Sequence, residues 1–141
     1  MLNVMHGKEI VLHVRNDMGI LAEVARRVAE KGVGIDAVSC SVDGEGEVCV
    51  LRLITDDNLR ACDVLLEFGY HPVEEAVVLL EAPHKPGMIK KLTQRLGEED
   101  VEICSLYATA SEKDAHCLMV LRTTNDSRAL VCLSEFAFVH A

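Results

Sequence analysis

Two short polar turns carry the residue types that could bind a small anion. The first reads Asn16-Asp17-Met18-Gly19 and leads directly into an apolar helical pattern that begins at Ile20. Asn16 and Asp17 lie where a helix takes its N-cap, because their side-chain oxygens can accept hydrogen bonds from the first backbone N–H groups. Those N–H groups can also hold a carboxylate, and a glycine has no Cβ to block its approach. An ordinary strand-to-helix connection has the same form, so the turn alone leaves both interpretations open.

The second turn, His84-Lys85-Pro86-Gly87, repeats the design 68 residues later (87 − 19). The same offset continues without a gap through strands, caps and core positions. It matches Leu12 with Leu80, Ile35 with Ile103, Cys49 with Cys117, Thr55 with Thr123 and Phe68 with Phe136. A register kept through so many kinds of position indicates an internal duplication of the chain.

Composition narrows the classes of function. The chain has 141 residues, half of them hydrophobic, with 4% aromatic residues, no Trp and a formal net charge of −9. An acidic chain repels phosphate groups, so neither nucleic acid nor an anionic membrane surface is an expected partner. The six cysteines form no C-x-x-C pair, and no secretory signal or stretch of transmembrane length stands out. The sequence therefore predicts a cytoplasmic protein with reduced thiols.

Each half of the chain is predicted to form a β-α-β-β-α-β unit of the ferredoxin-like kind. The first domain covers 1–75 and the second covers 76–141, and residues 1–8 are a short lead-in to the first strand. The predicted strands are 9–14, 35–42, 48–55, 70–75, 77–82, 101–109 and 115–123. The predicted helices are one that ends before Gly32 and those at 59–68, 88–96 and 126–136, with a stub at 137–141. The fold class is thus α+β, with both helices of each unit on one face of its antiparallel sheet.

The predicted edge strands and sheet faces indicate further association. Strands 35–42 and 101–109 are apolar yet lie at an edge, which favours their pairing edge to edge into an eight-stranded sheet. The sheet face that should be solvated also carries apolar residues, namely Val48, Val50, Leu118 and Val120. A solvated face should alternate to polar residues, so a homodimer is expected to cover it.

With this element order, the turn pattern resembles the ACT domain, a small ligand-binding module attached to many enzymes of amino-acid metabolism. The pattern is a polar residue, two further residues, Gly and then aliphatic residues. It stands here as Asn16-Asp17-Met18-Gly19-Ile20-Leu21 and as His84-Lys85-Pro86-Gly87-Met88-Ile89. The resemblance spans nearly the whole chain as two tandem copies, and it implies an amino-acid ligand held between the first loop of one copy and the second strand of the other.

Carried over residue by residue, the resemblance implies two sites. One consists of Asn16, Asp17, Met18, Gly19, Ile20 and Leu21 with Cys104, Ser105 and Leu106. The other consists of His84, Lys85, Gly87, Met88 and Ile89 with Asp36, Ala37 and Val38. The helix N-terminus would hold the carboxylate, Asn16 would accept from the ammonium, and strand carbonyls would complete the pocket. The family often has Asp or Asn where this chain has His84, and Pro where it has Met18, so either site could have lost its function.

Other chemistries receive less support from the sequence. His116 and Cys117 could join His13, His84 or His140 in a metal set, but no ligand spacing supports it. Acylphosphatases, small hydrolases that share this topology, use an Arg in the first loop and an Asn elsewhere. Arg15 and Asn58 resemble that pair only loosely. We therefore expect that the protein is not an enzyme and has no cofactor. The expected function is a regulatory protein that binds an amino acid or small carboxylate and modulates a partner such as a metabolic enzyme; the alternative is a docking module without a ligand.

Overall fold

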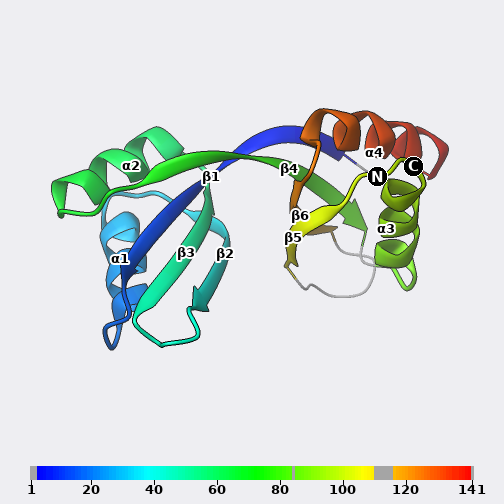
Figure 1. The fold of residues 1–141 in the computed structure, drawn as a ribbon. Coiled ribbons are helices and arrows are strands. Elements are labelled where there is room, and N and C mark those ends of the chain that lie inside the picture. Colours follow the sequence, from blue (N-terminus) through cyan, green and yellow to red (C-terminus); the bar gives the residue numbers. More distant parts are fainter. Residues whose placement is uncertain (1–2, 84, 110–115, 141) are drawn as a thin grey trace. The chain divides into compact units, whose positions relative to one another are not determined.

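The fold is described by a computed structural model over residues 3–83, 85–109 and 116–140. The described residues form six strands and four helices (Figure 1). In chain order these are β1 (Asn3–Arg15), α1 (Ile20–Glu30), β2 (Ile35–Val42), β3 (Val48–Thr55), α2 (Asn58–Glu67), β4 (Val73–Pro83), α3 (Met88–Glu98), β5 (Ile103–Ala108), β6 (His116–Thr123) and α4 (Asp126–His140). The predicted α+β class is confirmed.

The strands follow the order β2-β3-β1-β4-β6-β5 in one six-stranded sheet. The register is antiparallel for β3 with both β1 and β2, and for β6 with both β4 and β5. The two strands predicted to lie at edges, β2 and β5, each end this order. Each of them hydrogen-bonds to a single neighbour along one side only.

The chain divides into two compact units. The first unit is Lys8–Glu75, and the second joins Met1–Gly7 to Ala76–Ala141. The long strands β1 and β4 therefore each contribute residues to both units. Whether 1–75 and 76–141 act as two separate domains stays a prediction.

The predicted eight-stranded sheet is not what the structure shows, because the described residues form a sheet of six strands. Two predicted strands, 70–75 and 77–82, are one continuous strand, β4, since no residue from Val73 to Ala82 interrupts an extended chain. The predicted stub at the end of the chain continues helix α4 as far as His140 instead. Strands β2 and β5 stand at opposite ends of the strand order, so their predicted pairing does not occur within this sheet.

Residues predicted to be a lead-in belong to strand β1, which begins at Asn3. In the second unit this segment takes the place that a strand near the C-terminus would otherwise fill. Val4 packs against the core of that unit. A Cβ built on Gly7 would lie 2.5 Å from Cδ1 of Leu79, so the glycine leaves room for the Leu79 side chain. The last strand of the duplicated pattern is therefore supplied from the start of the chain.

Each unit has its own hydrophobic core between helices and sheet. In the first unit α1 and α2 lie on the same face of the strands (Figure 1). Its buried residues are Ile10, Leu12, Val24, Val28, Val33, Cys49, Leu51, Leu53, Ala61 and Leu65. In the second unit the core includes Val78, Leu80, Leu92, Leu96, Met119, Leu121 and Leu133. Both cores follow the alternation of strand residues and the helical spacing seen in the sequence.

The opposite sheet face is less exposed than the sequence suggested. Val120 is 1% exposed in the single chain, Val50 and Leu118 are half-buried, and Val48 is 38% exposed. The homodimer expected to cover this face stays a prediction.

A buried ion pair lies on this face within the first unit. The carboxylate of Glu9 is fully buried, and Nη1 of Arg52 donates to its Oε1 at 2.7 Å. The same Nη1 donates to Oε2 of Glu75 at 3.2 Å. Strands β1, β3 and β4 are thus joined by charge as well as by backbone hydrogen bonds.

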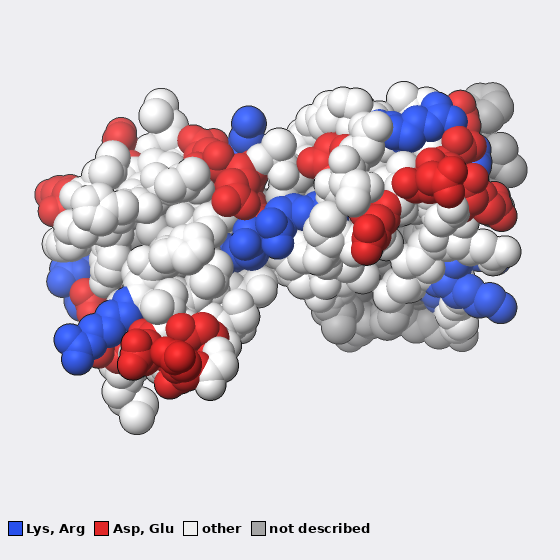
Figure 2. All heavy atoms as spheres, viewed as in Figure 1, with Lys and Arg blue, Asp and Glu red and all other residues white. Residues whose placement is uncertain are grey.

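Charged side chains of both signs are dispersed over the face of the molecule that Figure 2 draws. On the face drawn in Figure 2, the Lys and Arg side chains of the described residues lie in separate groups with Asp and Glu nearby. The described residues on this face form no continuous basic stripe of the kind that a nucleic-acid backbone requires. Within the described residues, no helix is both long enough and apolar enough to cross a membrane.

Candidate functional site

The first turn is shaped by its glycine. Gly19 is the N-cap of α1 and has a φ of 78°, in the left-handed region that favours glycine. The predicted capping by Asn16 or Asp17 is wrong, since no side chain caps this helix. The turn places Gly19 directly before Ile20 and moves both polar residues further upstream. The carboxylate of Asp17 instead forms an exposed ion pair with Nε of Arg15 at 3.2 Å.

Asn16 joins the first turn to the hairpin between β2 and β3. Its backbone N–H donates to the carbonyl oxygen of Glu47 at 2.8 Å. Its Nδ2 donates to the carbonyl oxygen of Gly46 at 3.0 Å. The amide is therefore held at its nitrogen end, which leaves Oδ1 as the end that can accept from a ligand.

The second turn has the same backbone design. Gly87 is the N-cap of α3 with a φ of 84°, again without a side-chain cap. The N–H of Met88 donates to the carbonyl oxygen of Lys85 at 3.3 Å, as that of Ile20 does to Asp17 at 3.2 Å in the first turn. His84, predicted as the polar anchor here, lies outside the described residues.

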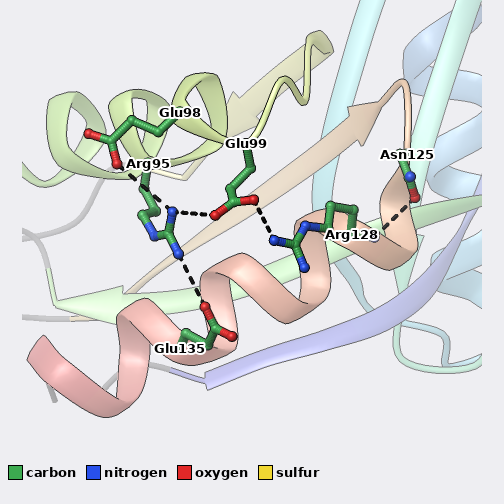
Figure 3. Close-up of polar contacts among 6 residues, drawn as sticks. All are labelled: Arg95, Glu98, Glu99, Asn125, Arg128 and Glu135. Atoms are coloured by element: carbon green, nitrogen blue, oxygen red, sulfur yellow. Dashed lines mark hydrogen bonds and ion pairs between the residues drawn. The ribbon is translucent and has the colours of Figure 1, made fainter.

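The N-termini of the other two helices, α2 and α4, are capped by side chains. In α2 the Oδ1 of Asp57 accepts from the N–H of Arg60 at 3.1 Å. In α4 the Oδ1 of Asn125 accepts from the N–H of Arg128 at 3.0 Å (Figure 3). The first N–H groups of a helix have no acceptor within the helix. A side-chain cap accepts from one of these N–H groups in α2 and in α4, whereas no described side chain does so in α1 or α3.

A pocket of about 330 Å³ lies at the start of α1. It brings together all six residues predicted from the first turn, together with three others. Its lining residues are Asn16, Asp17, Met18, Gly19, Ile20, Leu21, Ala22, Cys40 and Cys49. The sequence analysis placed Cys40 and Cys49 only within strand patterns and did not connect them with the turn.

A pocket of about 410 Å³ lies at the start of α3. It includes the described residues predicted for the second turn and adds residues from β5 and β6. Its lining residues are Pro83, Lys85, Gly87, Met88, Ile89, Lys90, Ala108, Thr109, Cys117 and Met119. The repeat offset could have identified the strand residues, because it matches Cys40 with Ala108 and Cys49 with Cys117.

The predicted strand residues do not line either pocket, as far as the described residues form them. Asp36, Ala37 and Val38 lie on β2, where Ala37 is buried and the other two are exposed. On β5, Cys104 and Leu106 are exposed, while the Oγ of half-buried Ser105 accepts from Nε of Arg122 at 3.0 Å. Their part in ligand binding stays a prediction.

The two pockets differ in chemistry. Lys85 and Lys90 bring positive charge to the pocket at α3. The pocket at α1 instead has two thiols, and burial, with a further contribution from the neighbouring Cys40, raises the pKa of the Cys49 thiol to about 11. The Cys49 thiol is therefore protonated at neutral pH.

The alternative sites of the sequence analysis can also be located. In the described part of the chain, no three or more His, Cys, Asp or Glu side chains are grouped so as to hold a metal ion. Asn58 donates through Nδ2 to the carbonyl oxygen of Lys8 at 3.0 Å and accepts from the hydroxyl of Thr55. Asn58 therefore makes local structural contacts, as Arg15 does with Asp17.

Comparisons with known proteins agree with this architecture. A family model described as the ACT domain pair matches residues 5–141. A protein from Bacteroides thetaiotaomicron has a TM-score of 0.85 at 24% identity, with 95% of this chain and 90% of that chain covered. The ligand-free regulatory subunit of aspartate kinase from Thermus thermophilus has a TM-score of 0.65 at 16% identity, with 95% of each chain covered. The corresponding subunit from Thermus flavus has a TM-score of 0.60 at 16% identity, with 96% of this chain and 94% of that chain covered. These solved structures share the fold, and no curated protein matches the sequence.

Proposed function

This chain belongs to the ACT domain pair family, and we propose that it binds an amino acid or a related small carboxylate and thereby modulates a partner. The ligand would be held at the turns before α1 and α3. The turn residues proposed for the two sites are 16–21 before α1 and 84, 85 and 87–89 before α3. Residues 36–38 on β2 and 104–106 on β5 are the strand residues proposed to take part in ligand binding.

One observation carries this proposal: α1 and α3, whose first residues line the two pockets described above, both lack a side-chain cap within the described part of the chain. Both start at a glycine with positive φ, whereas α2 and α4 are capped by Asp57 and Asn125. A carboxylate at these N-termini would receive hydrogen bonds from backbone N–H groups of the first turn, which no side chain of the described residues caps, and would also be stabilised by the helix dipole. The ligand would thus take the place that an Asx side chain occupies at the other helices.

The first site also offers a group for an ammonium. The Oδ1 of Asn16 can accept while its Nδ2 remains bonded to Gly46. A small amino acid has its carboxylate and ammonium on the same carbon, so a helix start and an acceptor in one turn suit its size. Carbonyl groups of an edge strand, near Asp36 or Ser105, would complete the pocket.

Thermal unfolding in the presence of each standard amino acid tests the proposal. A ligand present at about 100 times its Kd adds roughly 2.7 kcal/mol to the stability of the folded state. We expect at least one amino acid to raise the melting temperature by several degrees, and its amide derivative, which has no carboxylate, to have no effect. No shift with any amino acid or small carboxylate would contradict ligand binding.

The regulated partner is proposed to be an enzyme of amino-acid metabolism in the cytoplasm. The regulatory subunits of aspartate kinase share this fold and are named for regulating an enzyme, and we extend that kind of role to this chain. All six cysteines are free thiols in the structure, as is usual in a reducing compartment. A docking module without a ligand is the second candidate, and the same thermal experiment separates the two.

A further inference from the structure

Two cysteines face each other at the pocket before α1. The Sγ atoms of Cys40 on β2 and Cys49 on β3 lie 3.3 Å apart. The strands are antiparallel, with Cys40 opposite Leu51 and Val42 opposite Cys49. The two cysteines are therefore diagonal neighbours on one face of the sheet, a relation that separates the residues by about 7–8 Å. Their side chains nonetheless turn toward each other, as the distance of 3.3 Å between the Sγ atoms shows.

We propose that Cys40 and Cys49 are a reversible dithiol–disulfide pair that reacts with a small disulfide of the glutathione type. The Cys40 thiolate attacks one sulfur of the small disulfide, whose S–S bond breaks and releases one thiol. Cys49 then attacks the Cys40 sulfur of the mixed disulfide, gives up its proton to solvent and releases the second thiol. Two protein thiols are oxidised to one disulfide while the small disulfide is reduced to two thiols.

The order of attack follows from exposure. Cys40 is exposed and accessible to a small disulfide from solvent, whereas Cys49 is 1% exposed. Burial also raises the pKa of the Cys49 thiol, so Cys49 reacts poorly with reagents in solution. It is nonetheless the nearest thiol to the mixed disulfide formed on Cys40. The exposed residue is thus the attacking cysteine and the buried residue the resolving one.

The second repeat provides an internal contrast. The residue that corresponds to Cys40 there is Ala108, while Cys117 keeps the position of Cys49. Both line the pocket before α3, as the two cysteines line the pocket before α1. The dithiol pair therefore belongs to one pocket only, and Cys117 is a matched buried thiol without a partner cysteine in that position.

The disulfide would alter the pocket that the first turn lines. A bond length of about 2.05 Å requires the two sulfur atoms, now 3.3 Å apart, to move together at the wall of this pocket. On the proposed function, oxidation changes ligand affinity at the first site and leaves the second site unchanged. The chain would then respond to redox state as well as to its ligand.

The test begins with the full chain equilibrated in mixtures of reduced and oxidised glutathione, followed by rapid alkylation and mass mapping. We expect an intramolecular Cys40–Cys49 link that dithiothreitol reverses. Cys40→Ser and Cys49→Ala should each abolish the link, and Cys117→Ser should leave it unchanged. The exposed position of Cys40 makes its variant the one that retains the fold, as circular dichroism will verify. Full alkylation of both thiols, or a link only between chains, would overturn the disulfide pair.

The coupling to the ligand is measured separately by titrating reduced and oxidised protein with an amino acid found in the thermal experiment. We expect at least a fivefold change in the affinity of one site in the wild type and no change in Cys40→Ser. Equal affinities in the two redox states of the wild type would overturn the coupling. Failure of every amino acid to bind would overturn both the proposed function and the coupling, while the mapped disulfide would still establish the modification site.

Discussion

Glycine decides the geometry of both proposed sites at the scale of single residues. The sequence predicted Gly19 and Gly87 at the turns, and the positive φ of each explains why glycine stands there. A Cβ built on either residue would meet nothing within 4 Å. A larger residue would therefore be strained in its backbone and would occupy the space proposed for the ligand.

The sequence could not predict how the neighbouring polar residue is used. Asn16 has the type expected of an N-cap, but its Nδ2 contacts Gly46 in a hairpin 30 residues away. Such long-range hydrogen bonds depend on the path of the chain and leave no local signal. The contact between Cys40 and Cys49 was also missed, because it depends on the register of β2 against β3, which the predicted strand bounds alone do not specify.

Replacement of Asn16 by Ala tests its double role. The variant loses the hydrogen bond to Gly46 and the proposed acceptor for the ammonium, at a cost of about 1–3 kcal/mol in binding. We expect affinity at the first site to fall by about 5- to 150-fold, measured by calorimetry with the amino acid selected by thermal shift. The matched control is Asn58→Ala at the start of α2. An affinity equal to that of the wild type would remove Asn16 from the site.

Individual elements were predicted well where one unit contains all their contacts. The hairpin strands β2 and β3 were predicted with the bounds that the structure shows, because their alternation and the glycine-containing turn are local signals. Strand β1 was predicted too short and β4 as two strands, since the second unit takes its extra strand from the N-terminal residues. No local pattern indicates that two distant segments share a sheet.

The buried ion pair between Glu9 and Arg52 predicts that a substitution of Arg52 on β3 lowers the free energy of unfolding strongly. Arg52→Ala leaves the buried carboxylate of Glu9 without the guanidinium that lies 2.7 Å from it, which costs about 3–5 kcal/mol in unfolding free energy. Arg26→Ala, which removes an exposed pair with Glu30 on α1, should cost only about 0.3–0.5 kcal/mol. Urea unfolding of the two variants makes the comparison. Equal losses in the two variants would contradict the assignment of Glu9 and Arg52 as a buried pair.

Helices α3 and α4 are joined by an ion-pair network centred on Glu99 (Figure 3). Its carboxylate accepts from Arg128 and also from Nη1 of Arg95 at 2.9 Å. Arg95 in turn donates through Nη2 to Glu135 at 3.1 Å. The hydrogen bond from Arg128, followed by that from Arg95, lowers the pKa of Glu99 from its ordinary value.

This lowered pKa predicts a pH-dependent stability. The folded state loses the Glu99 proton more readily than the unfolded state, so the contribution is present above the ordinary value of 4.5 and is lost as pH falls through the lowered pKa. The melting temperature of Glu99→Gln should lie below that of the wild type at neutral pH and approach it in acid. Glu98→Gln, at the network's periphery 3.8 Å from Arg95, is the control. A difference that does not change with pH would contradict this role of Glu99.

At the scale of the whole molecule, the boundaries of the two compact units do not coincide with the boundaries of the sequence repeats. The repeat offset predicted two similar units, each with its own core. It did not predict that β1 and β4 would each belong to both units, because an offset compares residues and not connections. The same offset does reveal which site residues differ, such as Cys40 against Ala108.

Assembly is predicted at the edge strand β2, where Val38 and Val42 are 44% and 47% exposed. Apolar residues on an unpaired edge favour strand addition by a second copy. We expect a homodimer in analytical ultracentrifugation at micromolar concentration, and a monomer for Val38→Lys, with Val131→Lys on α4 as the control. A wild type that is strictly monomeric would exclude this assembly.

The central claim is that the turn before α1 holds the ligand, and calorimetric titration of paired glycine variants tests it most directly. Gly19→Val and Gly32→Val introduce the same side chain at the same φ of 78°, at opposite ends of α1, with nothing within 4 Å of either Cβ. Backbone strain of about 1–2 kcal/mol is therefore common to both. The account predicts that Gly19→Val loses binding at the first site while Gly32→Val keeps the affinity of the wild type. Unchanged binding by folded Gly19→Val, or equal losses in both variants, would contradict it.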